Sequence, residues 1–340
     1  EKLFFFGSYD GWRYRVTSPS QFVSIPSLRM RVGDFSELSV PIYDPLSTVC
    51  NGGVCTRTQF FDPSRATASN PTGANIIPLN RISAISNVYQ SLLPTPTSGG
   101  IQNNYLGQVP VGYDNNSLNL KIDYNITESQ RFSGLYTQGK RSQSGPYRET
   151  STAVPQTALP IPYTNTRLVE EIAKVFQLKH TWSIGNLINV ASFSYNHFFV
   201  PITNATSADK WSTKSGLRGL PAGDASDAFL EAPFGGPNAP AGWRGTDSRD
   251  FEDNNKNFTF QDSVVWTKGK HSFKFGAQYQ NVKDFVKTED TGSYFIANFS
   301  NVQTAGFAAN SSTPIATTGN AYASYLLGAL SSATVLENSV

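Results

Sequence analysis

The sequence has little charge and few residues that commonly bind metals or form disulfides. Only 15% of its 340 residues are charged, against roughly 25% in soluble domains, and it has two cysteines, three histidines and one methionine. A net charge of +2 provides no basic surface for nucleic acid, so we expect no nucleic-acid partner. No run of about 18 apolar residues occurs, which excludes a helical membrane span but not a β-barrel, whose strands give a weaker signal.

Aromatic residues are abundant instead. They make up 13% of the chain, with 23 phenylalanines and 15 tyrosines, and asparagine, serine and threonine are also frequent. Aromatic residues favour strands, whereas asparagine and serine favour turns and loops. The composition therefore indicates long strands joined by polar loops.

The clearest pattern covers residues 257–286. Two runs of about ten residues alternate between apolar and polar side chains, and Lys268-Gly269-Lys270 separates them, which predicts a β-hairpin. About ten residues let a tilted strand cross a bilayer, and one apolar and one polar face suit a strand between lipid and a water-filled lumen. The apolar positions are Phe258, Phe260, Val264, Trp266, Phe273, Phe275, Ala277 and Tyr279.

Other segments extend this pattern. Residues 118–138 and 176–199 predict two more hairpins, with tight turns at 127–130 and 184–186. Residues 2–13 predict a first strand, but aromatic side chains occupy both of its faces, so its facing stays open.

Two segments have patterns of their own. Apolar residues recur at helical spacing within 80–93, which predicts a helix that ends before Pro94. Residues 320–334 are apolar and alanine-rich, and they fit either a short helix in a loop or the start of another strand.

The lengths of the connections are one-sided. Antiparallel neighbours place alternate connections at opposite ends of a sheet, so the tight turns share one end and the long connections share the other. This arrangement predicts an all-β fold: a partial transmembrane antiparallel β-barrel, with about seven strands of a larger barrel and long extracellular loops. The predicted long loops cover about 14–114, 139–171, 200–256 and 287–318.

Four side chains on the predicted apolar stripes bear on this interpretation. Trp182 and Trp266 lie just before tight turns, where an aromatic girdle is expected. His180 and Asp262 oppose it, because polar and charged groups on a lipid face cost stability. A soluble two-sided sheet is the alternative.

Catalytic motifs are not apparent in the sequence. His180, His197 and His271 lie far apart, without a metal-binding spacing, and no nucleophile elbow, Walker A loop or dinucleotide fingerprint occurs. We therefore expect no enzyme activity and no cofactor.

The two cysteines frame a short glycine-containing loop. Cys50 and Cys55 flank Asn-Gly-Gly-Val, so a local disulfide is expected in an oxidising compartment, with free thiols as the alternative. Zinc is disfavoured, because structural zinc requires four ligands.

Two loop clusters are candidates for binding. Closely spaced carboxylates can bind Ca²⁺, but they lack an EF-hand pattern and basic residues lie nearby, which favours a salt-bridged surface. Aromatic loop residues either line a ligand vestibule or pack loop against loop. The carboxylates are Asp247, Asp250, Glu252 and Asp253, the basic residues are Arg244, Arg249 and Lys256, and the aromatic residues are Trp211, Phe229, Phe234, Trp243 and Phe251.

Several motifs resemble one protein family. Similar motifs occur in the same order in the barrel region of TonB-dependent outer-membrane receptors, specifically the Oar-like branch with a carboxypeptidase-regulatory-like N-terminal domain. The matching segments are 2–11 (KLFFFGSYDG), 31–38 (RVGDFSEL), 42–45 (IYDP), 77–83 (IPLNRIS), 92–94 (LLP), 103–105 (NNY), 266–271 (WTKGKH) and 273–276 (FKFG).

The resemblance implies a location and a function. Members of the family close about 22 strands around a plug and perform energised transport across the outer membrane of Gram-negative bacteria. It implies that residues 1–340 are an internal segment of the barrel domain, with the plug, the TonB box and the N-terminal module preceding Glu1. The implied partners are outer-membrane lipid, TonB through that preceding region, and a ligand that is a small molecule, an oligosaccharide or a peptide.

Two alternatives lack energised transport. An outer-membrane adhesin or passive barrel would use its loops for surface binding only. A soluble carbohydrate-binding β protein would fold without lipid, although seven strands in an open sheet leave two exposed edges.

Overall fold

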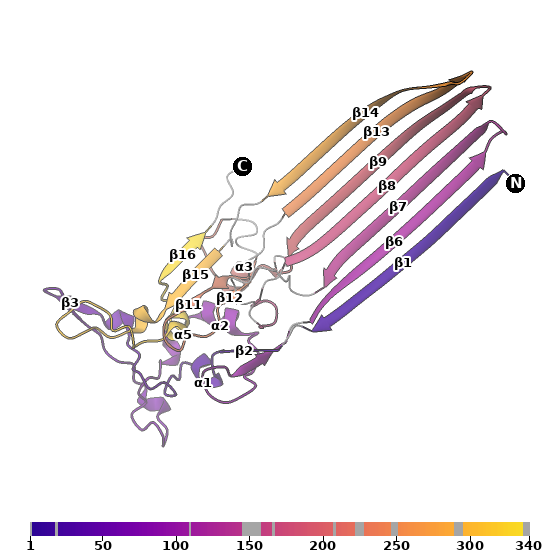
Figure 1. Ribbon diagram of the computed structural model, residues 1–340. Coiled ribbons are helices and arrows are strands. Elements are labelled where there is room, and N and C mark those ends of the chain that lie inside the picture. Colours follow the sequence, from indigo (N-terminus) through magenta and orange to yellow (C-terminus); the bar gives the residue numbers. More distant parts are fainter. Residues whose placement is uncertain are drawn as a thin grey trace.

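Seven long antiparallel strands form one sheet and lie in it in their order along the chain (Figure 1). The structure is a computed structural model that describes residues 2–17, 20–108, 110–144, 158–164, 167–206, 209–221, 228–245, 251–288 and 295–335. The strands are β1 (Leu3–Thr17), β6 (Pro110–Asn125), β7 (Gln130–Ser144), β8 (Arg167–Ile184), β9 (Leu187–Asn204), β13 (Phe251–Lys268) and β14 (His271–Thr288).

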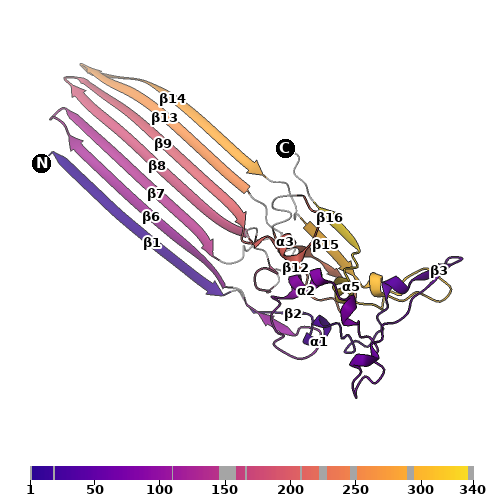
Figure 2. The ribbon, with the colours of Figure 1, turned by 180° about the vertical axis from the view of Figure 1, so that it is seen from behind.

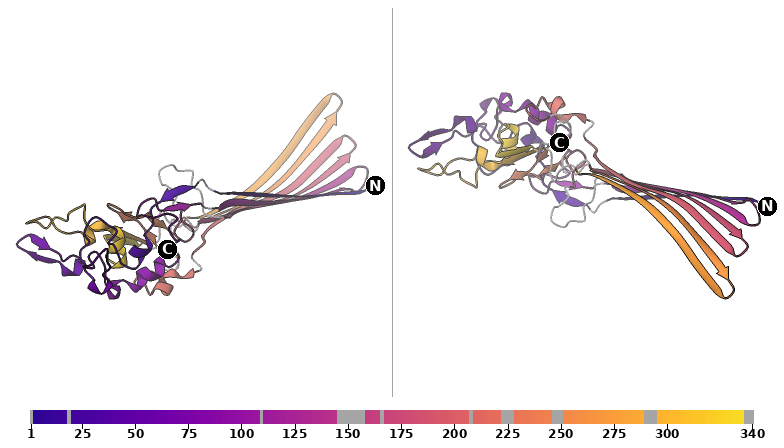
Figure 3. Two further views of the ribbon diagram at one scale, coloured as in Figure 1. Left: turned by 90° about the horizontal axis from the view of Figure 1, so that it is seen from below. Right: turned by 90° about the horizontal axis from the view of Figure 1, so that it is seen from above.

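The sheet is curved and open. In the views of Figure 3 the strands fan out along a curve, with β1 and β14 at the two edges. Within the described part of the chain, neither edge strand pairs with a further strand. The predicted all-β fold with an unclosed antiparallel sheet is confirmed.

Three tight turns lie at one end of the sheet, beside the N-terminus (Figure 1). They connect β6 to β7, β8 to β9 and β13 to β14, at the predicted positions. In the last two turns Gly185 and Gly269 have φ values of 57° and 61°, a region that favours glycine and matches the twist of a two-residue hairpin.

The strands extend further toward the long connections than the sequence predicted. The alternating apolar pattern ends before the strands themselves end. Where a strand leaves apolar surroundings, polar residues replace the apolar ones, although the hydrogen bonds between strands continue. The connections are 18–109 instead of about 14–114, 145–166 instead of 139–171, 205–250 instead of 200–256, and from 289 onward instead of 287–318.

The register gives the sheet one apolar and one polar face. Directly opposite residues of antiparallel strands share a face, so each row of partners across the sheet can be assigned to one side. One row on the apolar face is Leu120, Tyr136, Phe176, Tyr195 and Phe258. The row one residue away, on the polar face, is Lys121, Leu135, Gln177, Ser194, Thr259 and Gln280.

The register also settles the facing of the first strand. Phe5 lies opposite Ile122, which places it on the apolar face. Phe4 and Phe6 are therefore on the polar face, where their side chains are exposed.

The long connections fold together into a second body, termed here the loop domain (Figures 1 and 2). It contains short helices and small sheets, in which β15 lies between β10 and β11 as a parallel partner. Its helices are α1 (Leu28–Arg31), η1 (Pro45–Ser47), η2 (Pro63–Arg65), η3 (Leu79–Arg81), α2 (Ala84–Gln90), α3 (Trp211–Ser215), η5 (Asn301–Thr304) and α5 (Ala321–Leu326). Its strands are β2 (Gln21–Val23), β3 (Val49–Asn51), β4 (Val54–Thr56), β5 (Tyr105–Gly107), β10 (Glu231–Ala232), β11 (Phe234–Gly235), β12 (Trp243–Arg244), β15 (Phe295–Ser300) and β16 (Ser332–Val335).

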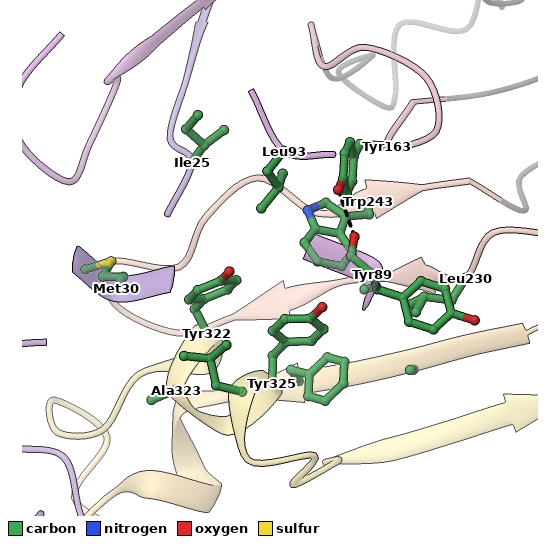
Figure 4. Close-up of a cluster of buried hydrophobic side chains, with 14 of the residues drawn as sticks. Ile25, Met30, Tyr89, Leu93, Tyr163, Leu230, Trp243, Tyr322, Ala323 and Tyr325 are labelled. Carbon is green, nitrogen blue, oxygen red and sulfur yellow. Dashed lines mark hydrogen bonds between the residues drawn. The ribbon is translucent and has the colours of Figure 1, made fainter. Parts of the chain in front are cut away.

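All four long connections contribute to one hydrophobic core in the loop domain (Figure 4). Phe35, Leu159, Phe229 and Tyr322 come from the first to the fourth connection in turn, and each side chain is fully buried. Among the described residues, every buried hydrophobic side chain lies in the loop domain and none lies in the seven-stranded sheet. The loops are therefore a folded unit with its own interior.

The two segments with special patterns both belong to this unit. The helix predicted within 80–93 forms as α2, whose Tyr89 is buried. Residues 320–334 contain both predicted alternatives, the helix α5 followed by the strand β16. The Asn320 side chain begins α5 by accepting hydrogen bonds from the backbone N–H groups of Tyr322 and Ala323 at 2.9 and 3.2 Å.

Polar contacts fasten the first connection to the last. The Ser86 hydroxyl donates to the Tyr325 carbonyl and the Tyr325 hydroxyl donates to the Ser86 carbonyl, both at 2.6 Å. Arg57 Nη1 donates to three backbone carbonyls between Val302 and Ala305 at 2.9–3.1 Å. These bonds tie side chains of one connection to the backbone of the other.

A bidentate ion pair lies within the first connection. The Arg81 guanidinium donates to both carboxylate oxygens of Asp44 at 2.6 and 2.7 Å. These hydrogen bonds hold the pKa of the Asp44 carboxyl below its usual value.

None of the helices in the described ranges is both long and apolar enough to cross a membrane.

The core of the loop domain makes a direct prediction. Phe229→Ala is expected to destabilise the loop domain by about 3–5 kcal/mol, because it leaves a cavity among the rings of Tyr89, Tyr163 and Trp211, whose centroids lie 4.8–5.2 Å from that of Phe229. Leu46→Ala, at a side chain that is 81% exposed, is the control and changes stability by less than about 0.5 kcal/mol. Thermal unfolding and limited proteolysis of the loops measure both, and equal protection in the two variants would contradict this role of Phe229.

Candidate functional site

The aromatic loop residues proposed from the sequence pack against one another. Trp211, Phe229 and Trp243 are buried in the loop-domain core. The centroid of the Phe229 ring lies 4.8 Å from that of Trp211 and 6.0 Å from that of Trp243. Phe234 packs on Trp243, with 5.4 Å between the ring centroids. Phe251 begins β13, and its side chain lies outside the described part. The sequence left open whether these residues line a ligand vestibule or pack loop against loop. The four described side chains pack loop against loop.

Tyrosines complete this core. The Tyr163 hydroxyl donates to the Tyr89 carbonyl at 2.8 Å (Figure 4). Burial raises the pKa of Tyr89 to about 12 and that of Tyr163 further still, so both phenols are neutral at physiological pH. Neutral, hydrogen-bonded phenols fit a structural role.

The carboxylate cluster is only partly within the described residues. Asp247 and Asp250 lie outside them, and Asp253 lies in β13, opposite Val200 and Val286. In the described ranges no three His, Cys, Asp or Glu side chains come close enough together to hold a metal ion.

A disulfide joins Cys50 and Cys55 across the β3–β4 hairpin, with their Cα atoms 4.1 Å apart. The turn residues Gly52 and Gly53 both have positive φ, 54° and 83°, which lets the hairpin close within so few residues. The disulfide fastens a local hairpin of the loop domain and touches no other candidate residue.

The polar face of the sheet carries an aromatic cluster that the sequence interpretation missed. Trp12 and Tyr14 of β1 stack with 5.6 Å between ring centroids, and Tyr113 of β6 stacks on Tyr14 at 6.2 Å. The Arg141 guanidinium of β7 lies 4.7 Å from the centre of the Tyr113 ring. Trp12 and Tyr14 remain 51% and 40% exposed, so their rings are open to contact. We term these four residues the aromatic platform.

The platform lies at the end of the polar face that leads into the loop domain. Trp12 is opposite Asn115, which is opposite Arg141, so the strands β1, β6 and β7 each contribute to it. The signal in the sequence is two aromatic residues at positions i and i+2, but their facing depends on the pairing of β1 with β6. Register, and not composition, identifies this cluster.

Charged groups on the rest of the polar face form a network. Asp123 accepts from Lys121 at 2.9 Å and Arg131 at 3.3 Å, and the Ser133 hydroxyl donates to it at 2.5 Å. Such groups require water or other polar partners, so the polar face suits a hydrated interior.

The apolar face leaves many large side chains exposed. Phe5, Phe260, Phe275 and Tyr279 are between 52% and 85% exposed. An apolar face of this size in water would drive association, whereas in a bilayer it is the contact surface. A sheet with this face outside, a hydrated face inside and tight turns at one end is the wall of a transmembrane β-barrel.

The comparison with protein families agrees with this class. The chain belongs to the outer membrane beta barrel domain family, whose model matches residues 1–340. It therefore forms barrel wall in the outer membrane of a Gram-negative bacterium, and its apolar face contacts membrane lipid. No match was found among curated proteins or among solved structures.

Two polar residues lie on the lipid-facing side, as the sequence indicated. His180 and Asp262 line a shallow hollow beside the small side chains Ala191 and Ala277. Asp262 lies six positions before Lys268, the end of β13, which puts it well inside the apolar band. Asn189 partly compensates the carboxylate by donating to Asp262 Oδ1 at 2.6 Å.

Removing the Asp262 charge is expected to stabilise the barrel. Asp262→Val should raise the free energy of unfolding in lipid vesicles by about 1 kcal/mol, because a carboxylate on the lipid face costs less than a lysine but still disfavours burial in the bilayer. Gln261→Val is the matched control on the polar face, where no gain is expected. Urea unfolding in vesicles measures both, and a loss of stability in Asp262→Val would contradict the assignment of this face to lipid.

Proposed function

We propose that this chain is part of a TonB-dependent transporter of the Oar-like branch, in which the sheet forms barrel wall and the loop domain captures a ligand. The observation that carries the proposal is the one-sided construction of the chain: three tight turns at one end and four long connections folded into one domain at the other. A receptor needs such a folded outer surface, whereas a simple pore does not.

The position of the N-terminus supports the same function. Residue Lys2 and the start of β1 lie at the tight-turn end, which faces the periplasm in outer-membrane barrels (Figure 1). A plug and a TonB box joined ahead of β1 would enter the barrel from the side on which TonB acts. The polar, charged face provides partners for such a plug inside the lumen.

Residues of the motifs that resemble the receptor family stabilise the loop domain. Phe35 is fully buried, Asp44 forms the ion pair with Arg81, and Asn104 both accepts from and donates to the Ile25 backbone at 2.8 and 2.9 Å. Because these stabilising residues lie in motifs shared with the receptor family, they favour the same loop-domain fold, and with it the same receptor function.

The aromatic platform favours a ligand with a flat apolar surface, such as a sugar ring or an aromatic side chain. Stacked rings offer such a surface, and the Arg141 guanidinium adds hydrogen-bond donors beside it. We assign binding and passage to this chain, and no catalysis.

Transport is tested by growth on a panel of oligosaccharides and peptides as sole nutrients. Deleting this gene and deleting the energy-coupling protein are expected to abolish growth on the same compound, because both are needed for energised uptake. Loss of growth on deletion of the gene alone would indicate a passive barrel. Loss of surface attachment without any growth defect would indicate an adhesin.

The platform makes a separate prediction for the ligand found in that screen. Trp12→Ala is expected to weaken its binding to the purified full-length protein about tenfold, because the ligand loses a stacking surface. Phe4→Ala, on the same face of the same strand but at the other end, is the control and leaves the affinity unchanged. Isothermal titration calorimetry measures both, and equal affinities would place the ligand elsewhere.

A further inference from the structure

Basic residues form an unbroken row on the apolar face of the sheet. Lys174 of β8 lies directly opposite His197 of β9, which lies opposite Lys256 of β13, which in turn lies opposite Lys283 of β14. We term these four residues the cationic row. With strands about 4.8 Å apart, the row extends roughly 15 Å across four adjacent strands.

Carboxylates do not neutralise the row. Among the described residues, none of its three lysines forms an ion pair, and His197 Nε2 hydrogen-bonds Asn254 at 3.0 Å. Other carboxylates near this end of the apolar face are engaged elsewhere: Asp114 by Arg15 at 2.6 Å, Glu170 by Lys140 at 2.8 Å, and Glu252 by a hydrogen bond from Asn254 at 3.2 Å. Lys256 and Lys283 are like charges directly opposite each other in an antiparallel pair, which is destabilising, so an anion from outside the chain would stabilise this part of the row.

The height of the row matches the outer boundary of the membrane. Lys174 lies ten positions before Ile184, and Lys256 lies twelve positions before Lys268, where the tight turns begin. In strands tilted as in outer-membrane barrels, this distance is about 25–30 Å, the full height of the apolar band. The row therefore lies where lipid chains give way to headgroups.

The side chains on the tight-turn side of the row fit this boundary. The next positions toward the tight turns carry Phe176, Tyr195 and Phe258, a row of rings on which the lysine stems can lie. At the opposite boundary, the described strands carry only one lysine or arginine on this face, Lys268, which lies 5.5 Å from the Trp266 ring. The excess of positive charge is confined to the extracellular side.

We propose that the cationic row binds the phosphate groups of lipids in the outer leaflet of the outer membrane. Acyl chains would cover the aromatic rings below the row, and lipid phosphates would lie between neighbouring lysines and offset their repulsion. Free phosphate offers the same anion without the chains, so lipid binding requires both parts of this surface.

The test uses full-length protein that has been delipidated in mild detergent. The probe is diphosphorylated lipid A, and native mass spectrometry counts the probe molecules bound to each protein. The variant combines Lys174→Gln, Lys256→Gln and Lys283→Gln. The control combines Lys179→Gln, Lys270→Gln and Lys274→Gln, which removes the same charge from the polar face and a tight turn. Circular dichroism and heat-resistant migration verify that both proteins are folded.

Wild type and control are expected to bind the probe equally, and the variant on the order of 100-fold more weakly, about fivefold per lysine. Dephosphorylated lipid A should bind wild type as weakly as the intact probe binds the variant. Inorganic phosphate at equal phosphate concentration should not displace the probe from wild type. Equal binding by variant and control, equal binding of dephosphorylated lipid, or displacement by inorganic phosphate would each overturn the proposal.

Discussion

The hydrogen bonding of the backbone in lipid is the constraint on which this structure depends. Every N–H and C=O group within the bilayer must find a partner in the protein, so neighbouring strands of the sheet pair along most of their length and their register is fixed. A slip of one residue would move every apolar side chain to the wrong face. Because the register is fixed, the rings of Tyr136, Phe176 and Phe258 share one surface and the cationic row shares one height.

The two parts of the chain gain stability from different surroundings. The sheet buries none of its described hydrophobic side chains within the protein and relies on lipid to cover them, whereas the loop domain encloses a core in water. The four connections share that core, so they hold together the strand ends from which they emerge. The loop domain is therefore a folded unit with its own core, joined to a wall that has no buried core of its own.

The wall was predictable from sequence and most of the loop domain was not. Period-2 alternation in residues such as Phe258 and Phe260 is a local signal, and so are the turns at Gly185 and Gly269. The core depends on contacts such as that between Ser86 and Tyr325, separated by more than two hundred residues, which no local pattern encodes. The aromatic platform and the cationic row depend on register, and for the same reason they emerge only from the paired strands.

The assignment of the two faces is tested most directly by spin labels placed singly along β13 in native outer-membrane vesicles. Labels at Phe260 and Val264 should be relaxed by oxygen dissolved in the lipid, and labels at Gln261 and Ser263 by a water-soluble nickel chelate. The alternation should persist over consecutive positions, since successive side chains of a strand point to opposite faces. Uniform accessibility, or oxygen contact at Gln261 and Ser263, would contradict a wall with lipid on one side and water on the other.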